Sequence, residues 1–234
     1  VALANNHSTN YGAGAFTDTL DVLKKNNIKY VGGGVNSGEA YSPTIIEKNS
    51  LKVAFLDFNS IVGAVNATED TPGVAKFDIK PWAETDDETD LARIKANIAS
   101  AKKQANLVVV EFHWGVEYEA KPIQSQINVA HAAIDAGADL VIGTHPHVVQ
   151  AMESYKNVPI FYSLGNFIFD QEWSTETKQG FVAETYFYNK KLVSIKTIPY
   201  QIEDYNQPHL ATEEQSKQIM SRIFGASLSS EYKN

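Results

Sequence analysis

The sequence of 234 residues contains no cysteine. This absence excludes disulfide bonds, cysteine-based zinc sites and thiol catalysis. Basic residues are outnumbered, with 20 Lys and Arg against 28 Asp and Glu, which gives a net charge of −8. A protein whose main ligand is nucleic acid needs a basic surface, so the charge argues against that class. No apolar run approaches the length of a membrane span, and no Gly-x-Ser-x-Gly elbow supports serine hydrolase chemistry.

The composition is that of a globular domain, with 43% hydrophobic and 21% charged residues. We find neither an internal repeat nor a linker that would separate two domains. We therefore expect one domain over residues 1–200 and a C-terminal extension, residues 201–234, that packs on it with a final helix. The sequence begins at Val1 within an apolar run, so we expect an upstream segment that is not represented here.

Apolar runs that suit buried strands alternate with stretches of helical periodicity, which predicts an α/β core. A helix bearing Phe16 and Leu20 should end near Asn26. A further helix should begin at a Thr85–Glu88 capping box, and another should have Pro122 in its first turn. The predicted strands cover residues 1–4, 28–31, 45–46, 51–58, 107–112, 140–143 and 159–163.

The tail has a different pattern. Residues 181–188 and 192–198 predict a hairpin that turns at Asn189-Lys190. Thr212 and Gln215 can form a capping box at the start of a last helix, whose apolar face would carry Ile219, Ile223 and Phe224.

Three histidines directly follow predicted buried strands. His113 follows residues 107–112, and His145 and His147 follow residues 140–143. Ligands of open α/β sheets collect outside the carboxyl ends of strands. Pro146 favours an extended His145, and in an extended chain residues i and i+2 point to the same side. The two imidazoles would then converge on one point, which suits a divalent metal.

A fourth histidine, His7, also follows an apolar run. A lone histidine at a strand end is more often a loop-capping residue, but four in matched positions favour a metal or phosphate site. His131 lies beside the inward face of a predicted helix, so we expect a hydrogen-bonded packing residue. His209 should be exposed to solvent. The acidic run at residues 84–90 lacks the spacing of a calcium loop and is expected to be a solvated helix start.

Four segments in this order resemble the CapA-type poly-γ-glutamate capsule proteins, which belong to the calcineurin-like metallophosphoesterase fold group. The resemblance covers residues 1 to about 170. The four segments are Ala4-Asn5-Asn6-His7 followed by Tyr11-Gly12, then His113-Trp114-Gly115-Val116-Glu117, then Asp135 to Asp139 running into Gly143-Thr144-His145-Pro146-His147-Val148, and finally Pro159 to Phe167.

The resemblance implies a four-layer α/β/β/α sandwich with a metal centre at the strand ends. It implies divalent metal ions (Mn, Fe, Zn or Mg). By the same resemblance, Asn6, His113, His145 and His147 match metal ligands and His7 matches a catalytic acid. Asn5, Glu117 and Asn166 match positions near the substrate.

The sequence also departs from the family pattern. The upstream segments that supply aspartate and glutamate ligands are not in this chain, and Ser8 and Asn10 stand where relatives often have acidic residues. A second metal would therefore need carboxylates from elsewhere. We expect the groove left by the upstream strands to be filled, either by the missing N-terminal segment or by a swapped neighbouring chain.

Two hypotheses about function follow. In the first, the protein serves poly-γ-glutamate capsule synthesis, export or anchoring at the extracellular face of the bacterial membrane, held there through the missing segment. Its partners would be an anionic polymer or a phosphate-containing substrate and other capsule-synthesis membrane proteins. In the second, it is an active metal-dependent phosphoesterase or a related hydrolase.

Overall fold

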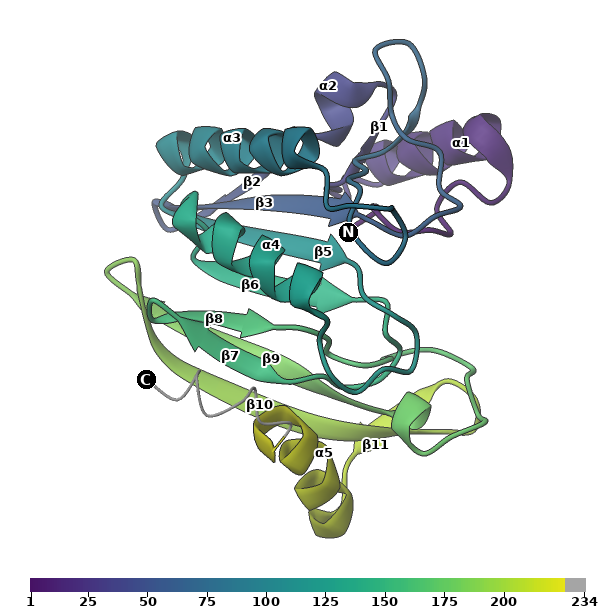
Figure 1. Ribbon diagram of the computed structural model, residues 1–234, viewed down its shortest axis with the longest axis vertical. Coiled ribbons are helices and arrows are strands. Elements are labelled where there is room, and N and C mark those ends of the chain that lie inside the picture. Colours follow the sequence, from purple (N-terminus) through teal and green to yellow (C-terminus); the bar gives the residue numbers. More distant parts are fainter. Residues whose placement is uncertain (226–234) are drawn as a thin grey trace.

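The computed structural model describes residues 1–225 (Figure 1). Helices and strands alternate through the first two thirds of the chain, and strands outnumber helices in the last third. In chain order the elements are α1 (Gly12–Lys25), β1 (Gly33–Gly34), α2 (Ser37–Ala40), β2 (Thr44–Lys48), β3 (Leu51–Asn59), β4 (Gly73–Val74), α3 (Glu88–Gln104), β5 (Leu107–His113), α4 (Gln124–Asp135), β6 (Leu140–Thr144), β7 (Met152–Tyr155), β8 (Val158–Phe161), a 3-10 turn (Glu176–Lys178), β9 (Gln179–Tyr188), β10 (Lys191–Glu203), β11 (Gln207–Leu210) and α5 (Glu213–Gly225).

A six-stranded sheet forms the centre of the molecule, in the order β2-β3-β5-β6-β8-β7. The four inner strands β3, β5, β6 and β8 run parallel, and the two edge strands are antiparallel to their neighbours. All four parallel strands therefore end on the same side of the sheet, the right side in Figure 1. This is the side on which α/β proteins bind their ligands.

Helices α3 and α4 lie side by side over one face of this sheet (Figure 1). Alternate residues of the strands point to this face, and they include Leu56, Val110 and Phe112. They form the main hydrophobic cluster with Ile94 and Ile98 of α3 and with residues of α4.

The opposite face of the central sheet packs against a second sheet, in the order β11-β10-β9. Val109 and Phe161 of the central sheet form a cluster there with Phe181 of β9 and with Ile219 and Ile223 of α5. The structure therefore has a helical layer, two stacked sheets and helix α5, and a further two-stranded sheet of β1 and β4 packs with α1 and α2. The predicted α/β fold is confirmed.

The expected domain boundary at residue 200 falls inside β10. Helix α5 packs against β10 and β9, and residues 226–234 of the expected extension lie outside the described residues. No helix within residues 1–225 combines the length and the apolar character that a bilayer crossing requires.

Two of the predicted strands are not strands in the structure. Residues 1–4 and 28–31 form a single parallel bridge, between Ala2 and Val31, and not a strand. Two backbone hydrogen bonds of 2.9 Å support this bridge, from Leu3 N to the Val31 carbonyl and from Val31 N to the Val1 carbonyl. The segment still directs the Asn5–Asn10 loop towards the carboxyl ends of the central strands.

The capping boxes predicted for two helices have opposite outcomes. Helix α3 begins later than expected, because the Asp87 carboxylate caps it by accepting hydrogen bonds from the backbone N–H groups of Thr89 and Asp90. The predicted Thr85–Glu88 box was wrong. The predicted box at α5 is confirmed, since Thr212 Oγ1 accepts from Gln215 N and Gln215 Oε1 accepts from Thr212 N. Phe224 lies on the exposed side of α5, unlike Ile219 and Ile223.

Candidate metal centre

The four strand-end histidines come together at the carboxyl ends of the parallel strands. His113 is the last residue of β5, and His145 and His147 follow the last residue of β6. The loop after Ala4 brings His7 to the same end. A pocket of about 360 Å³ opens there, lined by Asn5, Asn6, His7, His113, His147 and neighbouring residues.

Three side chains form a group with metal-binding geometry. One ligand atom from each of Glu117, His145 and His147 lies within 4.8 Å of the others. His113 lies beside this group and is not part of it, with its ring centroid 4.9 Å from that of His145. Glu117 thus stands among the histidines as a carboxylate donor, although the resemblance had placed it near the substrate.

His145 is the buried member of the group. The residue is only 5% exposed, and both of its ring nitrogens lack a hydrogen-bond partner among the described residues. Burial, and then the neighbouring His147 and His7, lower the pKa of His145 to about 4. A neutral imidazole is the form that ligates a metal. The donor set therefore fits a divalent ion, and a bound ion would satisfy a nitrogen that the protein leaves unpaired.

The backbone around Pro146 is not extended, contrary to the sequence argument. His145 has φ of 95° and His147 has φ of 60°, both in the region that disfavours residues with a Cβ. The rings still converge, at a centroid distance of 5.8 Å, because the chain turns sharply after β6. Strained conformations of this kind persist where the surrounding structure fixes them, and they cluster at functional sites.

Neighbouring side chains orient His113 and His7. His113 Nε2 lies 2.9 Å from Asn6 Oδ1, and its Nδ1 lies 2.9 Å from Thr144 Oγ1. Burial lowers the pKa of His113 well below its usual range, and the nearby histidines add to this effect. His7 is exposed and contacts Asn10 Nδ2 through its Nδ1, at 3.1 Å. Asn6 thus links the loop that carries His7 to the histidines of the central sheet.

Asn166 and Asn5 each make a contact that holds a histidine of the site, or its loop, in place. Asn166 is buried, and its Oδ1 lies 2.8 Å from His147 Nδ1, which leaves Nε2 of His147 directed towards Glu117 at 3.9 Å. A contact of this kind to the outer nitrogen fixes the orientation of a ligating histidine. Asn5 Oδ1 accepts a hydrogen bond from the backbone N–H of His7, which shapes the loop.

One buried and one half-buried carboxylate beneath the site were not predicted from the sequence. Asp57 of β3 and Glu111 of β5 are directly paired in the sheet register, and Glu111 lines the pocket. Burial, and then the charge of Glu111, raise the pKa of Asp57 well above its usual range, and burial raises the pKa of Glu111 to about 7. The signal was present in the sequence, because each is a single acidic residue in an otherwise apolar run.

The two remaining histidines lie as expected outside this group. His131 Nε2 is 2.8 Å from Glu153 Oε1, and its ring stacks on Tyr155 with centroids 3.8 Å apart. It is therefore a packing residue. His209 is exposed on β11.

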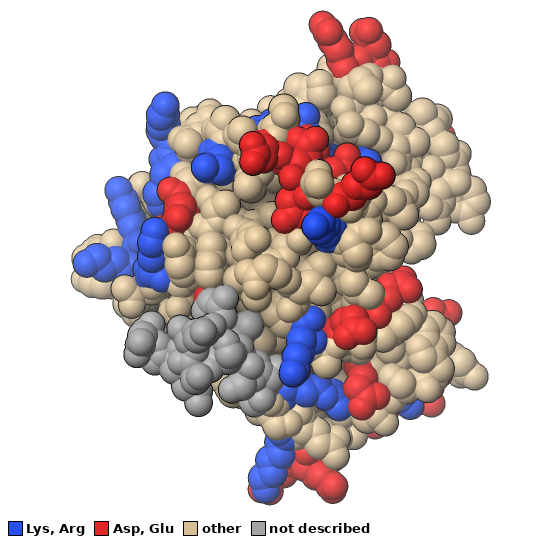
Figure 2. Space-filling model, viewed as in Figure 1, with Lys and Arg blue, Asp and Glu red and all other residues tan. Residues whose placement is uncertain are grey.

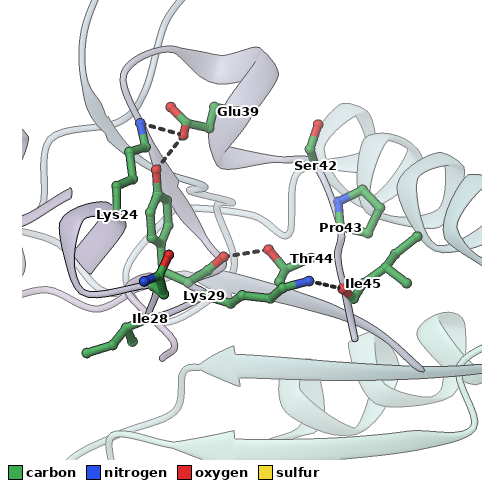
Figure 3. A pocket seen from close by; sticks show the side chains of 11 residues that line it. Lys24, Ile28, Lys29, Glu39, Ser42, Pro43, Thr44 and Ile45 are labelled. Carbon is green, nitrogen blue, oxygen red and sulfur yellow. Dashed lines mark hydrogen bonds and ion pairs between the residues drawn. The ribbon is translucent and has the colours of Figure 1, made fainter. Parts of the chain in front are cut away.

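A larger pocket, of about 560 Å³, lies between α1, α2 and β2 (Figure 3). Its polar groups bind one another. Glu39 accepts from Tyr30 at 2.5 Å and pairs with Lys24 at 3.2 Å, and Lys29 Nζ donates to the Ile45 carbonyl at 2.6 Å. This mutual pairing leaves little polar capacity for a ligand, in contrast to the unpaired nitrogens of His145.

The fold and the site define an α/β protein with a group of histidines and a carboxylate at the carboxyl ends of its parallel strands. Comparison with known proteins identifies the family. The family described as "Bacterial capsule synthesis protein PGA_cap" matches residues 1–171. The chain belongs to this family of bacterial capsule synthesis proteins, which confirms the resemblance to CapA-type proteins.

Three curated relatives align with most of the chain. The capsule biosynthesis protein CapA of Bacillus anthracis is 38% identical over 204 residues, which cover 86% of this chain and 47% of that protein. The PGA biosynthesis protein CapA of Bacillus subtilis strain 168 is 36% identical over 203 residues, which cover 86% and 50%. A probable polyglutamine synthesis accessory protein of Mycobacterium tuberculosis is 27% identical over 219 residues, which cover 86% and 55%. The chain thus spans about half the length of the curated relatives it matches.

Among solved structures, that of a hypothetical protein from Thermus thermophilus gives a TM-score of 0.45 at 14% sequence identity. The superposition covers 68% of this chain and 62% of that chain.

Proposed function

We propose that this chain is the metal-binding part of a bacterial surface protein that acts in the synthesis, export or anchoring of a poly-γ-glutamate capsule. The family and the names of its relatives support the capsule role. The unpaired ring nitrogens of buried His145, beside His147 and Glu117, carry the metal-binding part of the proposal.

In this proposal His145, His147 and Glu117 hold a divalent ion, with His113 and Asn6 beside them. The ion would supply a strong positive field at the mouth of the pocket and would act as a Lewis acid towards an oxygen ligand. Asn166 keeps the ring of His147 in place through the contact of 2.8 Å. A carboxylate of the polymer could bind at such a centre although the chain is acidic overall, because the local charge decides the contact.

The exposed His7 favours a second candidate function, metal-dependent hydrolysis of a phosphoester or a related bond. His7 lines the same pocket as His113 and His147, and its ring is accessible rather than buried. An accessible imidazole at this position can deliver a proton to a leaving oxygen. Turnover of a generic phosphodiester by the metal-loaded protein, lost on His7→Ala but with metal retained, would favour this candidate over a binding role.

The proposal extends to the surroundings of the protein. We place it at the extracellular face of the membrane, with other capsule-synthesis membrane proteins as partners. We further propose that additional carboxylate ligands come from an N-terminal segment or from a swapped neighbouring chain. The matched length of the relatives, about half of each, is compatible with such a segment.

Metal retention by the His145→Ala variant tests the proposed centre. The wild-type protein should bind Zn²⁺ or Mn²⁺, and its melting temperature should rise with metal because the ion binds only the folded state. The variant should lose both effects, while His209→Ala, which changes an exposed histidine, should keep them. In the presence of a chelator the two variants should melt within about 4 °C of the wild type, because removing an unpaired buried group offsets part of the lost packing.

Metal content and melting curves with and without a chelator provide these measurements. A packing role for His145 would give a different pattern. In that case the melting temperature of His145→Ala would fall equally with and without the chelator, and metal content would match that of His209→Ala.

A further inference from the structure

Five turns gather at the end of the molecule opposite the candidate metal centre. Because β3, β5, β6 and β8 run parallel, the connections that precede them all lie at the same end. The turn between β9 and β10 reaches this end as well, since Lys190 and Val158 line one pocket. The five connections are the β2–β3, α3–β5, α4–β6, β7–β8 and β9–β10 turns.

Lysines are concentrated on these turns and on the adjoining ends of the helices and strands. Figure 2 shows Lys and Arg side chains gathered along the left edge of the molecule, where Figure 1 places the turns. We call this surface the basic end, and it consists of Lys48, Lys52, Lys102, Lys103, Lys156, Lys190 and Lys191. Three acidic residues lie on the same connections, namely Glu47, Asp135 and Asp139. The basic end therefore has an excess of positive charge on a chain whose net charge is −8.

The acidic neighbours neutralise only some of these lysines. Lys102 pairs with Asp139 and Lys156 with Asp135, each at 2.5 Å, and Lys52 approaches Glu47 at 3.9 Å. The other four lysines make no ion pair with any residue in the described part of the chain. These four are Lys48, Lys103, Lys190 and Lys191. Unpaired like charges held close together repel one another, so the surface is suited to an anionic ligand.

A pocket of about 500 Å³ lies within the basic end, between the β7–β8 and β9–β10 turns. Lys156, Lys190 and Lys191 supply its ammonium groups. The rest of its lining consists of the apolar residues Val158, Phe187 and Leu192, of Asn157, and of Asp139, whose carboxylate is paired with Lys102. The combination of cationic groups with apolar walls suits a chain in which carboxylates alternate with short methylene segments.

The backbone conformation of the two turns indicates that their lysines do not stabilise the fold. Lys156 and Asn157 have φ of 51° and 64°, and Asn189 and Lys190 have φ of 47° and 65°. Hairpin turns with two positive φ values favour Asn and Gly, and a lysine costs roughly 1 kcal/mol more than glycine in this conformation. Each turn nevertheless places one lysine at a strained position beside the pocket.

We propose that the basic end binds a linear, carboxylate-rich polymer with amide links, as a second contact remote from the histidine site. The identity of the polymer rests on the proposed function, whereas the lysines and the pocket point to an anion site independently of it. A single extended chain fits the surface better than a membrane does. Three of the lysines line a recess, which an extended chain can enter and a flat bilayer cannot.

Binding of fluorescein-labelled poly-γ-glutamate, followed by anisotropy, tests the proposal. The variant Lys156→Gln/Lys190→Gln/Lys191→Gln should weaken binding by about tenfold or more and should reduce its dependence on NaCl. The matched control Lys25→Gln/Lys80→Gln/Lys95→Gln removes the same charge from exposed positions outside the basic end. It should weaken binding by no more than about twofold. Melting curves should show that both variants are folded.

Three further results separate the outcomes. His145→Ala without metal should still bind the polymer at the basic end, so that failure of the metal centre and failure of this proposal are distinguishable. Equal weakening in the two triple variants, or no binding by the wild type, would overturn the proposal. The competing ligands are single-stranded DNA and, separately, vesicles that contain phosphatidylglycerol. If the protein binds one of them more tightly than the polymer, and the first triple variant loses that binding, the proposed polymer would be replaced by that ligand.

Discussion

At the scale of single residues, His145 makes two unfavourable contributions to the stability of the fold, and packing alone does not offset them. Its φ of 95° is strained for a residue with a Cβ, and its two buried ring nitrogens lack partners in the described chain. An unpaired buried polar group costs roughly 1–3 kcal/mol, and a strained φ adds on the order of 1 kcal/mol. Both costs fall on a residue that adjoins His113, His147 and Glu117, so a ligand at this point accounts for them together.

Asp57 allows a prediction at the same scale. Its Oδ2 accepts a hydrogen bond of 2.7 Å from Ala4 N, and Gly32 leaves room for it, since a Cβ at Gly32 would lie 2.2 Å from that oxygen. The pKa of Asp57 is raised, so the folded state keeps a proton that the unfolded state releases above about pH 4. Stability is therefore lost as pH rises from that value.

The Asp57→Asn variant should remove part of this loss of stability at high pH. Its amide oxygen can still accept the hydrogen bond from Ala4 N. We expect the variant to be more stable than the wild type at pH 8, by on the order of 1–3 kcal/mol, and close to it at pH 4. Urea unfolding of the chelated protein at both pH values measures the difference. Asp18→Asn, at an exposed position of α1, is the control. An unchanged pH dependence in Asp57→Asn would show that Asp57 is ionised in the folded protein.

At the scale of elements, the start of α3 provides a direct comparison between two candidate caps. Asp87 accepts hydrogen bonds of 2.7 and 3.0 Å from the N–H groups of Thr89 and Asp90. Asp87→Ala should destabilise the protein by about 1 kcal/mol, the usual cost of losing an N-cap. Thr85→Ala should have little effect, because Thr85 is exposed and precedes the helix. Urea unfolding of the two variants provides the measurement, and a larger loss for Thr85→Ala would restore the sequence-based assignment of the cap.

The elements that could be predicted from the sequence are those fixed by local pattern. The β2–β3 and β9–β10 hairpins, α1 and the capping box of α5 depend on periodicity and on turn residues a few positions apart. The start of α3 was missed because several neighbouring residues can serve as caps, and packing of the helix against the sheet decides which one does. Residues 28–31 were predicted as a strand from their composition, but a strand needs a partner along its length, and only Val31 has one.

The candidate site likewise has features that a local sequence pattern predicts and features that depend on contacts between distant residues. The placement of His113, His145 and His147 after buried strands could be predicted, because parallel strands end together. The turn at Pro146 could not, since it depends on the contacts of His147 with Asn166 and with Phe169, whose ring centroid lies 5.1 Å away. The pairing of Asp57 with Glu111 depends on the register between strands far apart in the sequence. Acidic residues within otherwise apolar strands were the available signal.

At the scale of the whole molecule, the sheet separates two kinds of surface. Histidines and a carboxylate lie at the carboxyl ends of the parallel strands, and lysines lie on the turns at the opposite end. The net charge of −8 conceals this separation, because it averages over both ends. An anionic polymer could therefore contact the protein at two remote points, one through a metal ion and one through ammonium groups. Two such contacts would raise the overall affinity beyond that of either one alone.

The central claim, that the histidine group binds a metal, is tested most directly by anomalous diffraction from crystals of this chain grown with Zn²⁺. We expect an anomalous peak within about 2.0–2.2 Å of a ring nitrogen of both His145 and His147, with a Glu117 oxygen at a similar distance. Crystals of His145→Ala should lack that peak. A wild-type map with Zn²⁺ only at other histidines, such as His209, and with the His145 nitrogens still unpaired, would contradict this claim.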